Sequence, residues 1–270
     1  MKAFIMHFSF EFLAGLRNRT LLLMNYLLPL GFYLLVGGMM VQLNPAFGDQ
    51  LIPGMVVFAV LSGVILGLPT PLVEAREAGI LRSYKVNGVP ASSLLAIPAC
   101  STVLHMAVVT AVITLSAPML YASPLPVNWS AYLLVFFLTV FAYSGLGSLI
   151  GVLARNSRSA VLWQQLIYLP SILLGGLMVP AQMLPDNFVR LGHLLPATYA
   201  MIGLDGLAYR RNTLYDPLWA MLSLFIGGLV SFVLAFYLFT WDDRNTSRGR
   251  KQALAVLALV PYMLGALFLV

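Results

Sequence analysis

The chain has 270 residues, of which 60% are hydrophobic and only 9% are charged, and its mean hydropathy is +0.91. Soluble domains are roughly 45–50% apolar and about 25% charged, so this composition excludes a soluble globular protein, and it also excludes a disordered chain, which needs low hydrophobicity and high charge. We therefore expect a membrane protein, in which the placement of the basic residues matters more than the formal net charge of +6.

Seven apolar segments are candidates for membrane-crossing helices. A crossing helix needs about 20 mostly apolar residues, and backbone groups in lipid must bond internally, which favours helices. Six segments are predicted spans, and the seventh either spans or packs against the bundle without crossing. The segments are 21–40, 51–73, 94–116, 131–154, 160–179, 217–240 and 252–270.

The basic residues between these segments predict the orientation of the chain. Only Arg190, Arg210 and Arg211 lie on one side. The other side carries Lys2, Arg17, Arg19, Arg76, Arg82, Lys85, Arg155, Arg158, Arg244, Arg248, Arg250 and Lys251. Because Lys and Arg accumulate in cytoplasmic loops, we expect the N-terminus inside and a multi-pass protein of a prokaryotic plasma (inner) membrane.

The first residues, 1–19, precede the first predicted span. Their apolar side chains recur at helical spacing, which is typical of a helix lying in the membrane interface. An irregular cytoplasmic start is the alternative. The spaced residues are Phe4, Ile5, Phe8, Phe12, Leu13 and Leu16.

The sequence predicts a single membrane domain over residues 1–270. No connection is long enough for a nucleotide-binding domain, and no phosphate-binding loop motif occurs. No nucleophile motif is present, and Cys100 with three scattered histidines offers no metal site. We expect no catalytic residue, metal or cofactor in this chain, so any ATP must be hydrolysed by another chain.

A charged connection, 74–90, follows the second predicted span on the cytoplasmic side. A helix over 74–87, ended by a turn at 87–90, would have charged ends and a small apolar face, which suits docking on another protein. The alternative is an ordinary positive loop that only sets topology.

A second connection, 180–216, lies on the outer side and is interrupted by prolines. Its middle, 187–195, is predicted to form a helix at the outer interface, as part of a re-entrant or surface-lying hairpin rather than a full span.

Polar side chains inside the predicted spans are candidates for function, because they are costly in lipid. Gln164, Gln165 and Tyr168 lie in the fifth span. They either contact substrate or a second subunit, or they hold helices together within one subunit. His105 lies in the third span, and since no predicted span contains Asp or Glu, we expect it to be a structural histidine rather than a proton carrier.

Two motifs resemble the permeases of ABC-2 type transporters over roughly residues 1–245. The first is Glu74-Ala-Arg76-Glu77-Ala-Gly79-Ile-Leu81 followed by Gly88-Val-Pro90. The second is Val179-Pro180 with Leu184-Pro185 and Leu195-Pro196-Ala-Thr-Tyr199. Six spans, an inside N-terminus and an amphipathic lead-in helix also match. The apolar segment 252–270 departs from the usual six-span plan.

The resemblance implies a six-helix, type V-like ABC exporter bundle that dimerises, with an identical or a different permease, and binds a separate ATPase subunit carrying ATP and Mg. Segment 74–87 would be the coupling helix and 1–19 the connecting helix. The first and fifth spans would lie at the dimer interface, and the second and fifth would face the transport path. The implied ATPase-coupling residues are Glu74, Arg76, Glu77, Gly79, Leu81 and Arg82.

The lack of charge in the predicted spans favours an amphiphilic or apolar cargo, such as a drug, a lipid-like molecule or a glycolipid. Two other classes stay open. An ion- or proton-coupled secondary transporter should show carboxylates in its spans or matched broken helices. A non-transporting membrane scaffold would have no ATPase partner.

Overall fold

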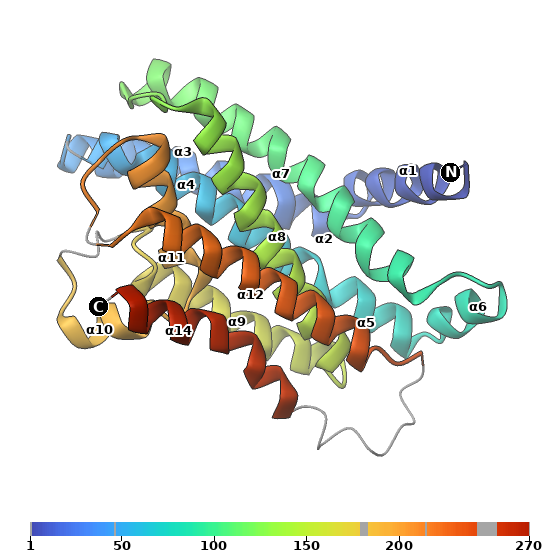
Figure 1. Cartoon of the computed structure of the whole chain (residues 1–270). Helices are drawn as coiled ribbons and strands as arrows, with labels where there is room; N and C mark the ends of the chain where they lie inside the picture. The colour runs from blue at the N-terminus through green and yellow to red at the C-terminus, as the bar shows by residue number, and fades with distance from the viewer. Residues whose placement is uncertain (1, 46, 179–182, 214, 242–252, 270) are drawn as a thin grey trace.

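The computed structural model describes residues 2–45, 47–178, 183–213, 215–241 and 253–269. Every regular element in these ranges is a helix. Figure 1 shows the long helices running alongside one another in one bundle, with α6 at one end and α10 at the other. We call these the α6 end and the α10 end.

Five helical runs in the described ranges are long and apolar enough to cross a membrane. They confirm the first, second, third, fourth and sixth predicted spans, with ends that differ by several residues. The runs are Arg19–Leu43 (α2 Arg19–Leu22, η1 Leu23–Leu27, α3 Leu28–Leu43), Phe47–Glu77 (α4 Phe47–Leu61, η2 Ser62–Leu66, α5 Pro69–Glu77), α7 (Ala91–Tyr121), α8 (Trp129–Leu153) and α12 (Pro217–Leu238).

The predicted fifth span is the shorter and less apolar helix α9 (Ser157–Leu174), which is not among those five. It begins at a capping box in which the Asn156 side chain accepts from the Ser159 N–H at 2.8 Å and the Ser159 hydroxyl accepts from the Asn156 N–H at 3.1 Å. The expected end at residue 179 is wrong. The helix stops at Leu174 because two glycines follow, and Gly176 has a φ of +80°. Residue 179 lies outside the described ranges.

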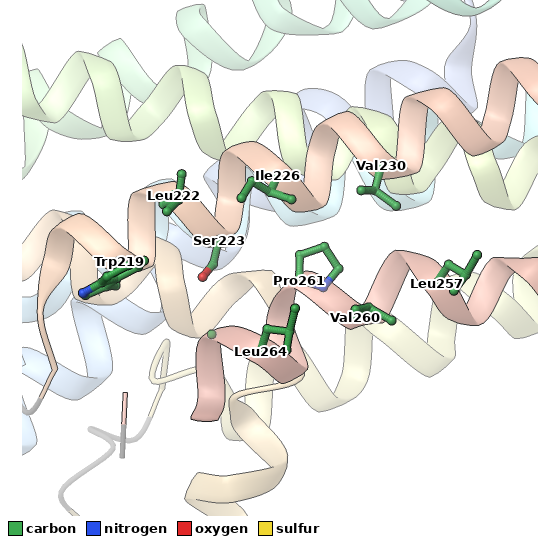
Figure 2. A pocket seen from close by; sticks show the side chains of 10 residues that line it. Trp219, Leu222, Ser223, Ile226, Val230, Leu257, Val260, Pro261 and Leu264 are labelled. Atoms are coloured by element: carbon green, nitrogen blue, oxygen red, sulfur yellow. The ribbon is translucent and has the colours of Figure 1, made fainter. Parts of the chain in front are cut away.

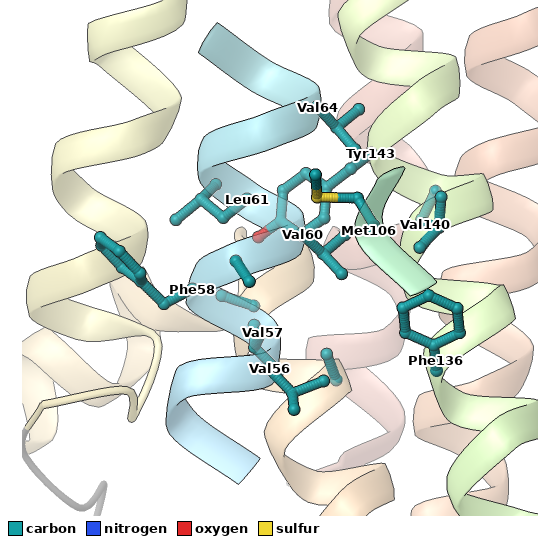
Figure 3. Packing of buried hydrophobic residues seen from close by; sticks show 14 of the residues in the cluster. Val56, Val57, Phe58, Val60, Leu61, Val64, Met106, Phe136, Val140 and Tyr143 are labelled. Atoms are coloured by element: carbon teal, nitrogen blue, oxygen red, sulfur yellow. The ribbon is translucent and has the colours of Figure 1, made fainter. Parts of the chain in front are cut away.

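The run α4–η2–α5 is the central helix of the bundle. Its stretch 51–68 is apolar on nearly all sides, which is typical of a helix enclosed by others, and 94% of the residues in its most apolar part are buried. Figure 3 shows Val60 on the side of α4 that faces Met106 of α7 and Val140 and Tyr143 of α8, and Leu61 on the opposite side. A movement of this helix must therefore be passed on to its neighbours.

The N-terminal segment forms helix α1 (Lys2–Arg17), so the alternative of an irregular start is wrong. It packs along α7, where the Phe12 ring stacks on the His105 ring at 4.6 Å. Its opposite side leaves apolar side chains exposed, namely Met6, Phe10, Leu13 and Leu16.

The connection at the α10 end differs from the prediction. The expected helix 187–195 is the shorter α10 (Asp186–Gly192), and a second helix follows it, α11 (Pro196–Gly203) with η4 (Leu204–Ala208). The sequence did not predict α11, which packs against α4, α8, α9 and α12. The Thr198 hydroxyl donates to the Gly192 carbonyl at 2.6 Å and holds the turn between α10 and α11.

The C-terminal segment forms η5 (Ala253–Leu259) and α14 (Val260–Leu269). Its apolar helical part is shorter than the five crossing candidates. It packs along α12, and Tyr262 is fully buried there. The segment therefore packs against the bundle, and this contact fits a seventh span and a non-crossing segment alike.

Candidate coupling site and transport helices

The charged connection is not one helix, as the sequence predicted, but two. Helix α5 ends at Glu77, and α6 (Ile80–Val86) begins after Gly79, whose φ is +74°. A glycine in this left-handed conformation commonly ends a helix, because it lacks the Cβ that makes the conformation costly. The Gly79 N–H donates to the Arg76 carbonyl at 3.1 Å and closes the last turn of α5.

The six predicted coupling residues fall into two groups. Arg76 and Leu81 are buried, at 4% and 2% exposure. The other four are exposed, namely Glu74, Glu77, Gly79 and Arg82. The exposed set lies on either side of the break at Gly79, so it forms an accessible surface on α5 and α6 at one end of the bundle.

The Arg76 side chain ends inside the protein at the last turn of α8. Its guanidinium donates to the Gly151 and Val152 carbonyls, each at 3.1 Å, and to the Ala154 carbonyl. The last carbonyls of a helix lack partners within the helix and carry its negative dipole end. A buried arginine is therefore stabilised here both by hydrogen bonds and by charge, and it fixes α5 to the end of α8.

Glu77 joins the same unit from the surface. Its carboxylate Oε2 accepts a 2.6 Å hydrogen bond from the hydroxyl of Ser157, the first residue of α9. Neighbouring residues at the end of α5 thus contact the end of α8 and the start of α9. These contacts join the charged connection, 74–90, to both helices.

The three polar residues singled out in the predicted fifth span differ in burial and in the contacts that they make. Gln164 is buried at 3% exposure, and its Nε2 donates to the Thr70 hydroxyl of α5 at 2.9 Å. The ring of Tyr168, also buried, lies 6.2 Å from the Phe58 ring of α4. Gln165 is only half-buried. Of the alternatives left open, packing within one subunit is what Gln164 and Tyr168 do in this structure.

His105 lies where α7 meets α1 and the first predicted span. The Tyr26 hydroxyl and His105 Nδ1 are 2.6 Å apart and share a hydrogen bond. On its other side a Cβ at Gly15 would lie 2.5 Å from His105 Nε2, so only glycine lets α1 approach this closely. These contacts agree with a structural histidine.

A half-buried ion pair at the α10 end was not predicted. Arg211 Nη1 donates to the Asp205 carboxylate of η4 at 2.7 Å, and Nη2 donates to the Asp49 carbonyl near the start of α4 at 2.5 Å. Burial raises the pKa of Asp205, and the Arg211 charge opposes that rise only in part. The pair ties η4 to the central helix.

The sequence model of the ABC-2 type transporter family matches residues 2–209. The chain therefore belongs to the ABC-2 type transporter family and is the membrane component of an ABC transporter, a transport permease. The matched region contains the charged connection, the central helix and α11, and it ends before α12 and α14.

Curated relatives agree with this assignment. The putative transport permease YvfS of Bacillus subtilis is 22% identical over 223 residues, which cover 81% of this chain and 89% of the relative. The inner membrane transport permease YadH of Escherichia coli is 26% identical over 203 residues, which cover 75% and 76%. Nodulation protein J of Sinorhizobium fredii is 33% identical over 95 residues, 34% of each chain. No solved structure matches the chain.

Proposed function

We propose that this permease is the membrane half of an exporter that moves an amphiphilic or apolar molecule out of the cell. Two permease subunits would act with separate ATPase subunits, which bind ATP and Mg, while this chain holds no cofactor. The α6 end would face the cytoplasm and the α10 end the outside.

The observation that carries the proposal is the fixation of the coupling connection to the bundle. An ATPase subunit that moved the exposed surface of α5 and α6 would pull on Glu77 and, beneath it, on Arg76. Because Arg76 binds the end of α8 and Glu77 binds Ser157 of α9, both helices would move with the central helix. This gives a direct path from ATP binding to the transport helices.

Dimerisation is proposed through α9 and α3. Both helices expose rows of large apolar side chains. Such side chains are stable in contact with lipid, and they can also make van der Waals contacts with a second copy. The exposed residues are Leu162, Leu166, Leu169 and Leu173 on α9, and Leu34, Leu35 and Met39 on α3. Gln164 points into its own subunit, so the proposed interface is apolar.

The first test is a tagged purification in mild detergent from the native cell, with partners identified by mass spectrometry. We expect a P-loop ATPase at one copy per permease. A folded permease that brings down no ATPase would overturn the exporter proposal, and the secondary transporter or the scaffold would then remain.

The second test reverses one charge. Glu77→Lys should weaken ATPase association or uncouple transport while membrane insertion stays normal. Ser157→Ala removes the partner of Glu77 but keeps the exposed carboxylate, so it should keep ATPase association. Arg190→Glu on α10, an equally drastic reversal at the other end, is the control. Normal transport by Glu77→Lys at normal expression would remove Glu77 from the coupling role.

A further inference from the structure

An elongated groove runs between α12 and the C-terminal helices η5 and α14. Figure 2 shows side chains of the two walls lining it, with Trp219 at one end and Val230 and Leu257 at the other. Its volume is about 390 Å³. All lining residues belong to α12, η5 and α14, so the groove exists because of a segment that lies beyond the part of the chain matched by the family.

The chemistry of the walls is almost entirely apolar. Leu222, Ile226 and Val230 follow one side of α12 at helical spacing, and Val260 and Leu264 face them from α14. The single polar side chain is Ser223. Apolar walls that leave space unfilled lose dispersion contacts, so the natural occupant is a hydrocarbon.

The two helices that line the groove touch each other at its floor, which leaves no space for another helix between them. A Cβ at Gly227 would overlap the Tyr262 hydroxyl, which shows that α12 and α14 touch directly behind the groove. Packed helix axes need about 8–10 Å, and these two helices leave no such room between them. A single flexible chain fits where a helix of a second subunit does not.

The length of the groove matches one leaflet. Trp219 and Val230 are separated on α12 by about 16 Å at the usual rise per residue, and half of a bilayer core is about 15 Å. Trp219 is 45% exposed and lies in the first turn of α12, the position where tryptophan sits at the membrane interface.

We infer that this groove binds one acyl chain of a bilayer phospholipid from the leaflet at the α10 end. The headgroup lies beside Trp219, and the chain runs between the two walls toward Val230. The occupant is a resident lipid rather than cargo, since none of the walls comes from α4, α5 or α9. The binding of an acyl chain does not rest on the proposed function; only its distinction from cargo does.

The test uses the full chain in lipid nanodiscs that contain phosphatidylglycerol with a photoreactive diazirine on one acyl chain. Cross-links are mapped by mass spectrometry. A diazirine near the headgroup should label the region of Trp219, and one near the chain end should label the region of Val230 and Leu257. Labelling of α12 and α14 should exceed that of the exposed apolar residues of α7, namely Val108, Val112 and Leu115.

Matched tryptophan variants separate the groove from the general lipid surface. Val260→Trp and Leu222→Trp fill the groove from either wall and should reduce its labelling to the level of the exposed α7 residues. Met263→Trp and Leu229→Trp place the same ring on exposed positions that do not line the groove, and should leave labelling intact. Unchanged labelling in folded Val260→Trp and Leu222→Trp, or no dependence on diazirine depth, would overturn the inference.

Discussion

Gln164 Nε2 donates a 2.9 Å hydrogen bond to the Thr70 hydroxyl and so joins α9 to the central helix inside one subunit. Hydrogen bonds between helices in membranes contribute about 0.6 kcal/mol on average, and typical buried ones about 1 kcal/mol. The bond is therefore expected to contribute only modestly to the packing of α9 on the central helix.

Gln164→Leu should lower the free energy of unfolding by about 1 kcal/mol, measured by denaturant unfolding in detergent micelles. Thr70→Val should cost a similar amount, and the double variant should cost less than the sum, because both changes remove one bond. Gln165→Leu, at a half-buried neighbouring position, is the control and should change stability little. Additive costs would contradict the coupling between these two side chains.

Arg76→Met should destabilise the protein by about 3 kcal/mol or more, because it leaves buried carbonyls at the end of α8 without a donor. Arg76→Lys should rescue only part of this loss, since an ammonium lacks the planar fork that reaches several carbonyls at once. Thermal unfolding in micelles measures both. Lys85→Met on exposed α6 removes the same charge and should be nearly neutral.

Gly79→Ala should cost about 1–2 kcal/mol, the penalty of a side chain in the left-handed conformation. No neighbour lies within 4 Å of the added Cβ, so the backbone alone is responsible. Gly38→Ala is the matched control, because its Cβ is equally free of neighbours but its backbone is helical. Alanine there should stabilise by roughly 0.5–1 kcal/mol. Equal changes in the free energy of unfolding at both positions would show that the left-handed conformation of residue 79 does not penalise a side chain.

The half-buried pair of Asp205 and Arg211 predicts a pH dependence. Because burial raises the pKa of folded Asp205, the folded state holds this proton more tightly than the unfolded state does. Stability should therefore fall as the pH rises from the ordinary aspartate pKa of about 4 through the folded value. Arg211→Gln should enlarge this fall in stability, because removing the Arg211 charge lets the pKa of Asp205 rise further.

Melting temperatures recorded from about pH 4 to about pH 7 test this. Asp205→Asn should abolish the part of the pH dependence that this residue contributes. At neutral pH, Arg211→Gln should lower the melting temperature more than the double variant Asp205→Asn with Arg211→Gln does. The double variant leaves no unpaired charge in this half-buried place. A melting temperature of Arg211→Gln that rises with pH over this range would contradict the sign.

Hydropathy alone determined the membrane class and most of the helices, because every crossing helix must bury its backbone groups and present apolar side chains to lipid. The spacing of the apolar residues in 1–19 also predicts the helix that the structure has at residues 2–17. The break at Gly79 had a local signal, a glycine within a charged helical pattern. The spacing of the charges, however, predicts one helix over 74–87. The shortened α9 had a similar signal in Gly175 and Gly176.

Only the tertiary structure decided which polar residues act together. The Arg76 side chain binds carbonyls of Gly151 and Val152, far away in the sequence, and no local pattern distinguishes a buried arginine from the exposed basic residues of the same connection. The Asp205–Arg211 pair depends likewise on how η4 folds back toward the start of α4. Hydropathy reports the surroundings that each residue prefers, whereas a hydrogen bond between distant segments depends on the packing of whole helices, and packing is a property of the assembled bundle.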